Sequence, residues 1–206
     1  LTFTSMLVAM AIALPLGVAA AARKGSAVDQ TAMGVAVAGV AMPRFWLGPM
    51  LIILFAIKLD WFPVSGAESW RHLVLPSLTL GTALAAFLSR MTRASMLETL
   101  REDFVTVARA KGLGRQVVLW KHAFRNALLP IITVLGLELG TLLGGAIVTE
   151  KVFAWPGMGT LLLTGIEKRD YNTVRATVLI FTVSYVLVNA LIDVAYSRID
   201  PRVRKR

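Results

Sequence analysis

The sequence contains no cysteine, and its only two histidines, His72 and His122, lie far apart along the chain. A disulfide framework and a thiolate metal site are therefore excluded, and thiol redox or zinc chemistry is not expected. A phosphate-binding loop of the form GxxxxGK[ST] is also missing, so the chain is not expected to hydrolyse ATP itself. No Ser/His/Asp arrangement or pair of carboxylates at useful spacing suggests a catalytic site.

Charged residues are scarce as well. They make up 17% of the 206 residues, whereas 56% are hydrophobic, and the mean hydropathy is +0.69. This balance is too apolar for a soluble core of this size and indicates an integral membrane protein. The expected fold class is an all-α, polytopic bundle of transmembrane helices.

Five apolar segments are long enough to cross a bilayer. They cover about residues 1 to 22, 31 to 57, 73 to 97, 127 to 148 and 176 to 197. We expect residues 1 to 206 to form a single transmembrane domain with its ends on opposite sides of the membrane. The chain starts at Leu1 rather than Met, directly in an apolar run, so we expect a truncated or processed N-terminus.

Basic residues are distributed unequally between the alternate loops. One set of loops and segment ends holds fifteen, namely Arg23, Lys24, Arg90, Arg93, Arg101, Arg109, Lys111, Arg115, Lys121, Arg125, Arg198, Arg202, Arg204, Lys205 and Arg206. The other set holds six, namely Lys58, Arg71, Lys151, Lys168, Arg169 and Arg175. The positive-inside rule places the first set in the cytoplasm, with residue 1 outside and the C-terminus inside. The tryptophans agree, because Trp61, Trp70 and Trp155 fall near the predicted outer interface and Trp120 near the inner one.

The predicted cytoplasmic loop at residues 99 to 126 is basic and amphipathic. Within it, Phe104, Val107 and Ala108 follow the i, i+3, i+4 spacing of one helical face. Acidic residues at the start and basic residues near the end complement a helix dipole, and Gly112 is a natural C-terminal stop. The loop is thus predicted to contain a short helix with a small apolar surface.

Two interpretations of this helix remain open. It could lie on the lipid surface, or it could insert into a groove of a partner protein. Because the apolar face is narrow and carries a single aromatic residue, Phe104, a protein groove is the favoured site.

Three ionisable residues lie within apolar segments: Arg44, Glu138 and Asp193. Such residues mark aqueous cavities, internal pairs or the ends of spans. Asp193 is close to Arg198 and is interpreted as part of an interfacial pair or as a helix-end contact. Arg44 follows Pro43, where a kink is expected, and Glu138 is deep in its span. Arg44 and Glu138 either line a translocation cavity or pair with each other.

Small residues and turn formers mark the last part of the chain. Gly136, Gly140 and Gly144 repeat every fourth residue, which predicts close helix contact either within the chain or at a subunit interface. The external loop at residues 149 to 175 contains Pro156 and several glycines, so it should break after the span and re-enter or lie along the outer surface. An alternative is an interfacial anchor through Phe153 and Trp155.

Several separated motifs resemble one family of transport proteins, in that family's order and over essentially the whole chain. They are "FWLGPMLIILFAIKLDWFPVSG", "SRMTRASMLETLREDFV", "ARAKGLGRQVVLWKHAFRNALLPIITVLGLELGTLLGGAIVTEKVFAWPGMGTLL" and the terminal "DPRVR". They resemble the membrane subunits (permeases) of ABC importers of the dipeptide, oligopeptide and nickel group. That resemblance implies a type I importer transmembrane domain in the bacterial inner membrane, lacking one N-terminal span here.

The resemblance also implies what the cytoplasmic loop does. In the family, a Glu-Ala-Ala-xxx-Gly motif docks into a cleft of the ATP-binding subunit. Here its glycine corresponds to Gly112 and its first three positions to Thr106, Val107 and Ala108, of which only the alanine matches literally. The residues implied in coupling to the ATPase are Phe104, Thr106, Val107, Ala108, Arg109, Ala110, Lys111 and Gly112.

The expected function is therefore a transport subunit without enzymatic activity that forms the path for di- or oligopeptides. Glutathione and nickel are alternative cargoes of the same group. The expected partners are a homologous second permease, two ATP-binding subunits that carry ATP and Mg²⁺, and an external substrate-binding protein. An ion-coupled secondary transporter is the rival from another class, but it would leave the cytoplasmic helix without a role. A nucleic-acid binder is disfavoured because the basic residues are scattered.

Overall fold

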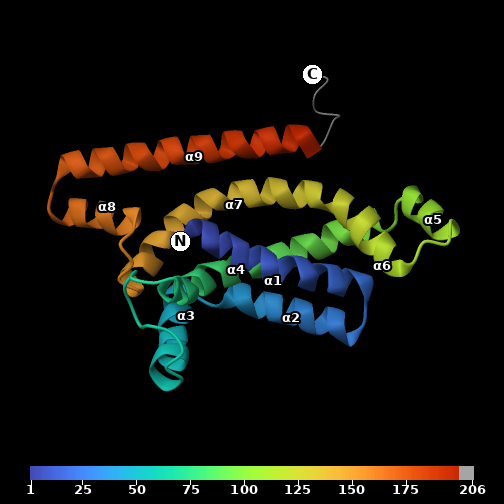
Figure 1. The fold of residues 1–206 in the computed structure, drawn as a ribbon, viewed down its shortest axis with the longest axis horizontal. Helices are drawn as coiled ribbons and strands as arrows, with labels where there is room; N and C mark the ends of the chain where they lie inside the picture. Colours follow the sequence, from blue (N-terminus) through green and yellow to red (C-terminus); the bar gives the residue numbers. More distant parts are fainter. Residues whose placement is uncertain (200–206) are drawn as a thin grey trace.

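The computed structural model describes residues 1–199, apart from the side chains of residues 44, 139, 141, 143–145, 192, 193 and 195–199. Every regular element across 1–199 is a helix, and long helices lie side by side along the molecule (Figure 1). The elements are α1 (Thr2–Ala22), α2 (Ala27–Ala41), α3 (Arg44–Leu51), the π-helix η1 (Ile52–Lys58), α4 (Arg71–Thr99), α5 (Asp103–Ala110), α6 (Arg115–Val117), the π-helix η2 (Val118–Ala123), α7 (Phe124–Val152), α8 (Met158–Glu167) and α9 (Tyr171–Ile199).

The α1–α4 pair forms the centre of the bundle, and small residues allow the two helices to approach closely. A Cβ atom at Gly17 of α1 would lie 2.5 Å from Cβ of Thr92 and 2.8 Å from the Ser89 carbonyl oxygen of α4. On the other side of the contact, a Cβ at Gly81 of α4 would lie 2.8 Å from the Ser5 carbonyl oxygen. Close backbone approach is how transmembrane helices gain packing energy without a hydrophobic driving force.

Buried aliphatic side chains fill the space around this pair. The central cluster joins residues of α1, α4 and α7, namely Ala9, Ala13, Leu80, Leu84, Ala85, Leu88, Ile131, Leu135, Leu142 and Ala146. A polar contact reinforces the α1–α4 interface, since the hydroxyl oxygens of Thr4 and Ser77 lie 2.7 Å apart. The core thus holds three of the long helices as one unit.

The predicted span at 31 to 57 is broken beside Arg44. It consists of two helical segments that meet at an angle of 108°. The break falls at Met42 and Pro43, which have extended backbone conformations between α2 and α3. A proline at this position cannot continue the preceding helix, and it disfavours helical geometry at the residue before it. The kink expected beside Arg44 is therefore confirmed.

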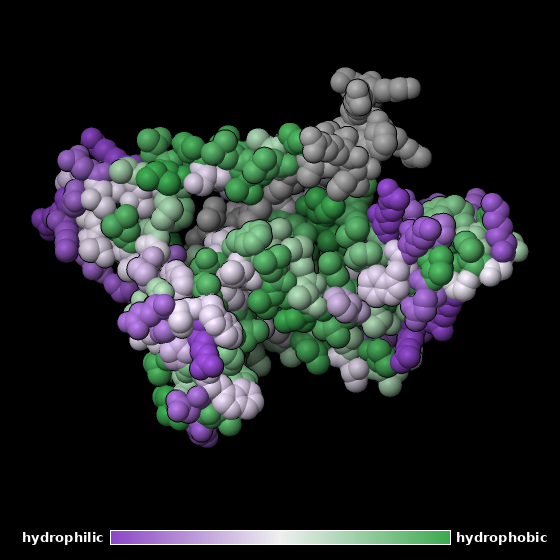
Figure 2. Space-filling view, in the orientation of Figure 1, coloured by the Kyte–Doolittle hydropathy of each residue, from purple (hydrophilic) through white to green (hydrophobic). Residues whose placement is uncertain are grey.

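The long helices bring two polar regions to opposite ends of the molecule (Figure 1). The end of α1, the start of α2, the end of α4 and the helices α5 and α6 gather at one end, called here the α5 end. The helix α8 lies at the other, the α8 end. Figure 2 shows hydrophobic surface between two more hydrophilic ends, which is the distribution expected for a membrane-embedded bundle.

Among the described residues, three helical stretches are long and apolar enough to span a membrane, and the bent α2–α3–η1 segment is a possible fourth. The three are Thr2–Ala22, Arg71–Thr99 and Tyr171–Leu191. Each matches a predicted span, and α7 occupies the remaining predicted one at 127 to 148. The described helices therefore agree roughly with the polytopic fold expected from the sequence.

Candidate functional site

The candidate site is the loop at the α5 end, where α5 projects away from the long helices (Figure 1). The helix has an extended residue, Glu102, before its first turn, with Asp103 in that turn and Arg109 in the last. These charges complement the helix dipole at both ends. The short helix predicted within the loop at residues 99 to 126 is therefore confirmed, from Asp103 to Ala110.

The apolar residues of α5 divide between two faces. Val105 is fully buried and Ala108 is 6% exposed, and both pack against Val118 of η2, with Leu100 at the edge of the cluster. Phe104 and Val107 face outward, with 40% and 52% of their surface exposed. The prediction that Phe104, Val107 and Ala108 share one apolar face is therefore wrong for Ala108, because that side chain is buried against Val118 while the other two face outward.

The remaining predicted coupling residues lie on the exposed surface of this loop. They are Thr106, Arg109, Ala110, Lys111 and Gly112. Together with Phe104 and Val107 they form an exposed surface with a small apolar area, which we call the α5 outer surface. It has the composition of a docking surface with an apolar centre and a charged rim.

Gly112 ends α5 for a conformational reason. Its φ of +76° lies in the left-handed region, which disfavours side chains with a Cβ. The Gly112 amide donates to the Arg109 carbonyl at 2.9 Å, and the Leu113 amide donates to the Ala108 carbonyl at 3.4 Å. This pattern is a Schellman cap, which confirms the predicted helix stop.

The base of the loop is tied to the first helix of the bundle. Arg115, at the start of α6, donates a hydrogen bond from Nη2 to the carbonyl oxygen of Ala22 at the end of α1. Below it, Leu119 and Ala123 of η2 pack with Val18 and Ala21 of α1. A displacement of α5 would therefore be transmitted to α1 as well as to α7.

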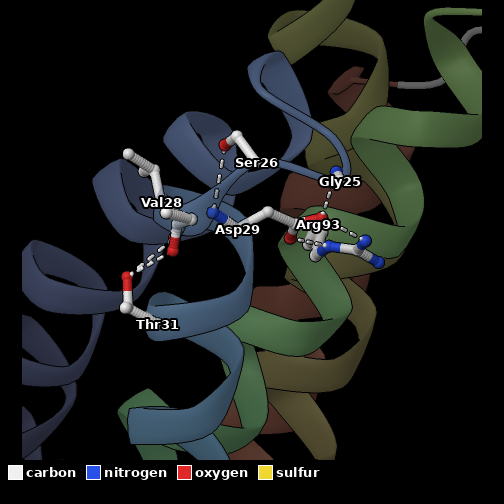
Figure 3. Close-up of polar contacts among 7 residues, drawn as sticks. Gly25, Ser26, Val28, Asp29, Thr31 and Arg93 are labelled. Atoms are coloured by element: carbon white, nitrogen blue, oxygen red, sulfur yellow. Dashed lines mark hydrogen bonds and ion pairs between the residues drawn. The ribbon is translucent and has the colours of Figure 1, made fainter.

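An ion pair that the sequence analysis did not identify joins α2 to α4 (Figure 3). Arg93 donates from Nε and Nη2 to the two carboxylate oxygens of Asp29, at 2.5 and 2.7 Å. The Gly25 amide also donates to Asp29 at 2.9 Å, and the Ser26 hydroxyl accepts from the Asp29 amide. The Ser-x-x-Asp spacing of a helix start was a readable local signal, but the Arg93 partner lies far away in sequence.

At the α8 end, a buried glutamate organises the loop between α7 and α8. Glu150 is 6% exposed, and its Oε2 accepts a hydrogen bond from the Thr160 amide at 2.8 Å, in the first turn of α8. A side chain at Gly157 or Gly159 would overlap the Glu150 carboxylate. These contacts explain the glycines of "WPGMGT". The predicted break after the span is confirmed, because α7 ends at Val152 and α8 begins at Met158.

The predicted pathway residues are only partly described. Glu138 is half-buried on α7, whereas the side chains of Arg44, Asp193 and Arg198 lie outside the described residues, as does the terminal "DPRVR". Their suggested roles remain predictions. Of the glycine repeat, Gly140 lies against α9, since a Cβ there would be 2.9 Å from the Tyr185 ring. This contact supports packing within the chain at that position.

Comparison with known proteins shows relatives in sequence and in fold. The permease protein GsiC of the glutathione transport system from Escherichia coli K12 is 46% identical over 204 residues, covering 99% of this chain and 67% of the relative. The Salmonella choleraesuis GsiC protein is 45% identical over the same shares of each chain. Two inward-facing crystal structures of the MetNI methionine ABC transporter share the fold. They have TM-scores of 0.80 and 0.76 at 19% and 20% identity, over 97% of this chain and 91% of theirs.

The model of one transport family covers residues 13–205. A membrane component of a transport system is consistent with the motifs of the sequence, with the helical bundle and with the apolar surface between two polar ends. The chain belongs to the binding-protein-dependent transport system inner membrane components, as an ABC importer permease of the dipeptide, oligopeptide and nickel group.

Proposed function

We propose that this permease carries short peptides across the inner membrane, with glutathione as the first candidate substrate. The observation that supports this proposal is the 46% identity to the GsiC glutathione permease, spread over 99% of the chain. Other di- or oligopeptides remain the second candidate and nickel the third, because permeases of the group share the motifs found here.

In this proposal the α5 outer surface docks into a cleft of an ATP-binding subunit. Phe104 and Val107 supply its exposed apolar centre, while the Gly112 cap fixes where the helix ends. ATP and Mg²⁺ are bound by the partner, and closure of two ATP-binding subunits displaces α5. The packing of Leu119 and Ala123 against α1 then converts that displacement into a tilt of the bundle.

The proposed assembly contains a homologous second permease, two ATP-binding subunits and an external substrate-binding protein. The α5 end faces the cytoplasm because the loops around α5 and between α1 and α2, which belong to the set richer in basic residues, gather there, so residue 1 is outside and the C-terminus inside. Arg44 and Glu138 are proposed to line the pathway and to present opposite charges to a zwitterionic peptide. The external loop around α8 faces the binding protein.

Uptake by cells lacking the chromosomal gene tests the substrate proposal. Cells complemented with the full-length gene should accumulate labelled glutathione, and excess unlabelled glutathione should compete better than a dipeptide or nickel. Arg44→Ala and Glu138→Gln should reduce uptake while the complex still assembles. Uptake of nickel or a dipeptide in place of glutathione would contradict the substrate assignment. Full transport by both variants with unchanged selectivity would contradict the pathway assignment.

A further inference from the structure

A cavity of about 350 Å³ opens between the last two turns of α1 and the segment α6–η2. Its α1 wall runs from Pro15 to Ala22, and its remaining walls include Arg23, Arg115 and Trp120. The two arginines lie at the end of α1 and at the start of α6, so both positive charges are at the α5 end of the molecule. Trp120 is partly exposed and packs edge-on against Phe124, with ring centroids 5.2 Å apart.

The dimensions of the cavity match an amphiphilic ligand. Pro15 and Ala22 are seven residues apart, which corresponds to about 10 Å along a helix axis. Every α1 residue between them that lines the cavity is apolar. The lining of the cavity is therefore basic beyond the end of α1 and apolar along the last two turns of α1.

A second cavity, of about 380 Å³, lies next to the first and shares Ala22, Arg115 and Leu119 with it. It adds a third arginine, Arg109. Within residues 1–199, the ion pairs between described side chains join Arg93 to Asp29 and Lys151 to Glu167. None of the three cavity arginines has a carboxylate partner in that described part of the chain. Their positive charge is therefore available to an anion.

We propose that this cavity binds an anionic phospholipid of the leaflet at the α5 end. The phosphate lies between Arg23 and Arg115, and one acyl chain follows α1 from Ala22 toward Pro15. Basic pockets between transmembrane helices on the cytoplasmic side recognise such headgroups. An acidic side chain of an ATP-binding subunit could meet the arginines, but it would leave the apolar wall of α1 uncovered. The inference rests on the proposed orientation of the α5 end.

Trp120 provides a local probe for the test. The complete complex with the full-length chain is reconstituted in nanodiscs of phosphatidylcholine that contain increasing brominated phosphatidylglycerol, or brominated phosphatidylcholine as a comparison. Bromine quenches tryptophan fluorescence at short range. The chain holds five tryptophans, so the Trp120 signal is obtained by subtracting the Trp120→Phe variant.

We expect stronger Trp120 quenching by the brominated anionic lipid than by the brominated zwitterionic one. Arg23→Gln should raise the fraction of anionic lipid needed for half-maximal quenching by about tenfold, the effect of losing one charged hydrogen bond to the phosphate. The matched control is Lys24→Gln, because Lys24 is adjacent, exposed and not among the cavity residues. It should leave the midpoint unchanged.

Equal quenching by both lipids would overturn the proposal. So would equal shifts in Arg23→Gln and Lys24→Gln, because they would indicate general surface attraction rather than a site. Loss of the ATP-binding subunit from purified Arg23→Gln complex, with lipid quenching unchanged, would assign the arginine to that subunit instead. These results are independent of which substrate the complex transports.

Discussion

Asp29 and Arg93 hold the start of α2 against α4 through two hydrogen bonds, from Nε to Oδ1 at 2.5 Å and from Nη2 to Oδ2 at 2.7 Å. The Asp29 side chain is only 6% exposed and that of Arg93 26%. A two-bond guanidinium–carboxylate pair is among the stronger polar contacts in proteins. This pair fixes α2 before the chain turns at Pro43.

Removing one partner of this pair should destabilise the bundle. We expect Asp29→Ala to lower the free energy of unfolding by about 2 kcal/mol, because Arg93 loses its charged hydrogen-bond partner. Thermal denaturation of the purified complex measures the effect. The reciprocal exchange Asp29→Arg with Arg93→Asp should recover part of the loss. A double exchange less stable than both single variants would show that the pair itself is not what holds α2.

The close approach of α1 and α4 predicts a position-specific effect of a single methyl group. Gly17→Ala should destabilise the complex by about 1–3 kcal/mol, since the new Cβ would press on Thr92 and the α4 backbone. Gly34→Ala is the matched control in a helix, with open space around its Cβ, and should be neutral or stabilising by up to about 1 kcal/mol. Equal melting temperatures for the two variants would contradict the packing described for α1 and α4.

Glu150 should control the order of α8. Glu150→Ala removes the acceptor of the Thr160 amide, so that amide should exchange hydrogen faster and the complex should lose about 1–3 kcal/mol. Glu150→Gln keeps a carbonyl acceptor and should behave more like the unchanged chain. The control, Glu167→Ala, removes an exposed ion pair with Lys151 and should change stability by less than about 1 kcal/mol. Unchanged exchange at Thr160 in Glu150→Ala would contradict the capping role.

Asp170 should make the start of α9 sensitive to acid. The Thr173 hydroxyl donates to it at 2.6 Å and the Thr173 amide at 3.1 Å, and these bonds lower the pKa of Asp170 from its ordinary value. Because the folded-state pKa lies below the unfolded one, the cap stabilises α9 above the unfolded pKa and is lost as the pH falls through the folded pKa. Amides in the first turn of α9 should therefore exchange faster in acid, with fully developed protection at neutral pH.

The Asp170→Asn variant separates this effect from general acid unfolding. Asparagine caps helices but does not titrate in this range, so the acid-dependent change at the first turn should disappear. An identical pH dependence in the variant would mean that another group is responsible.

Much of the fold was predictable from local sequence. Runs of apolar residues predict α1, α4 and α9 because a span needs a length that few soluble helices reach. Pro43 predicts a break because proline cannot continue a helix. Gly112 predicts a stop because glycine readily adopts the left-handed conformation that ends many helices. The angle of 108° between α2 and the helical segment that follows it was not predictable. It depends on how α3 packs against α4, which lies further along the chain.

The candidate site shows where local patterns fail. The helix α5 has eight residues, and Phe104, Val105, Val107 and Ala108 are all apolar, so spacing alone does not decide which pair faces inward. Its contact with Val118 makes that choice. The Asp29–Arg93 and Glu150–Thr160 contacts were missed for a related reason, because each depends on how separate helices or turns meet.

We propose above that the exposed face of α5 couples this permease to an ATP-binding subunit. The most direct test is co-purification of that subunit with the full-length chain carrying Phe104→Asp, compared with Phe104→Leu, followed by assay of ATP hydrolysis. An apolar anchor at the centre of a docking surface predicts at least about tenfold weaker association for the aspartate variant. The leucine variant should keep both association and hydrolysis. If Phe104→Asp binds the subunit as the unchanged chain does and supports the same ATP hydrolysis, the α5 outer surface is not the coupling site.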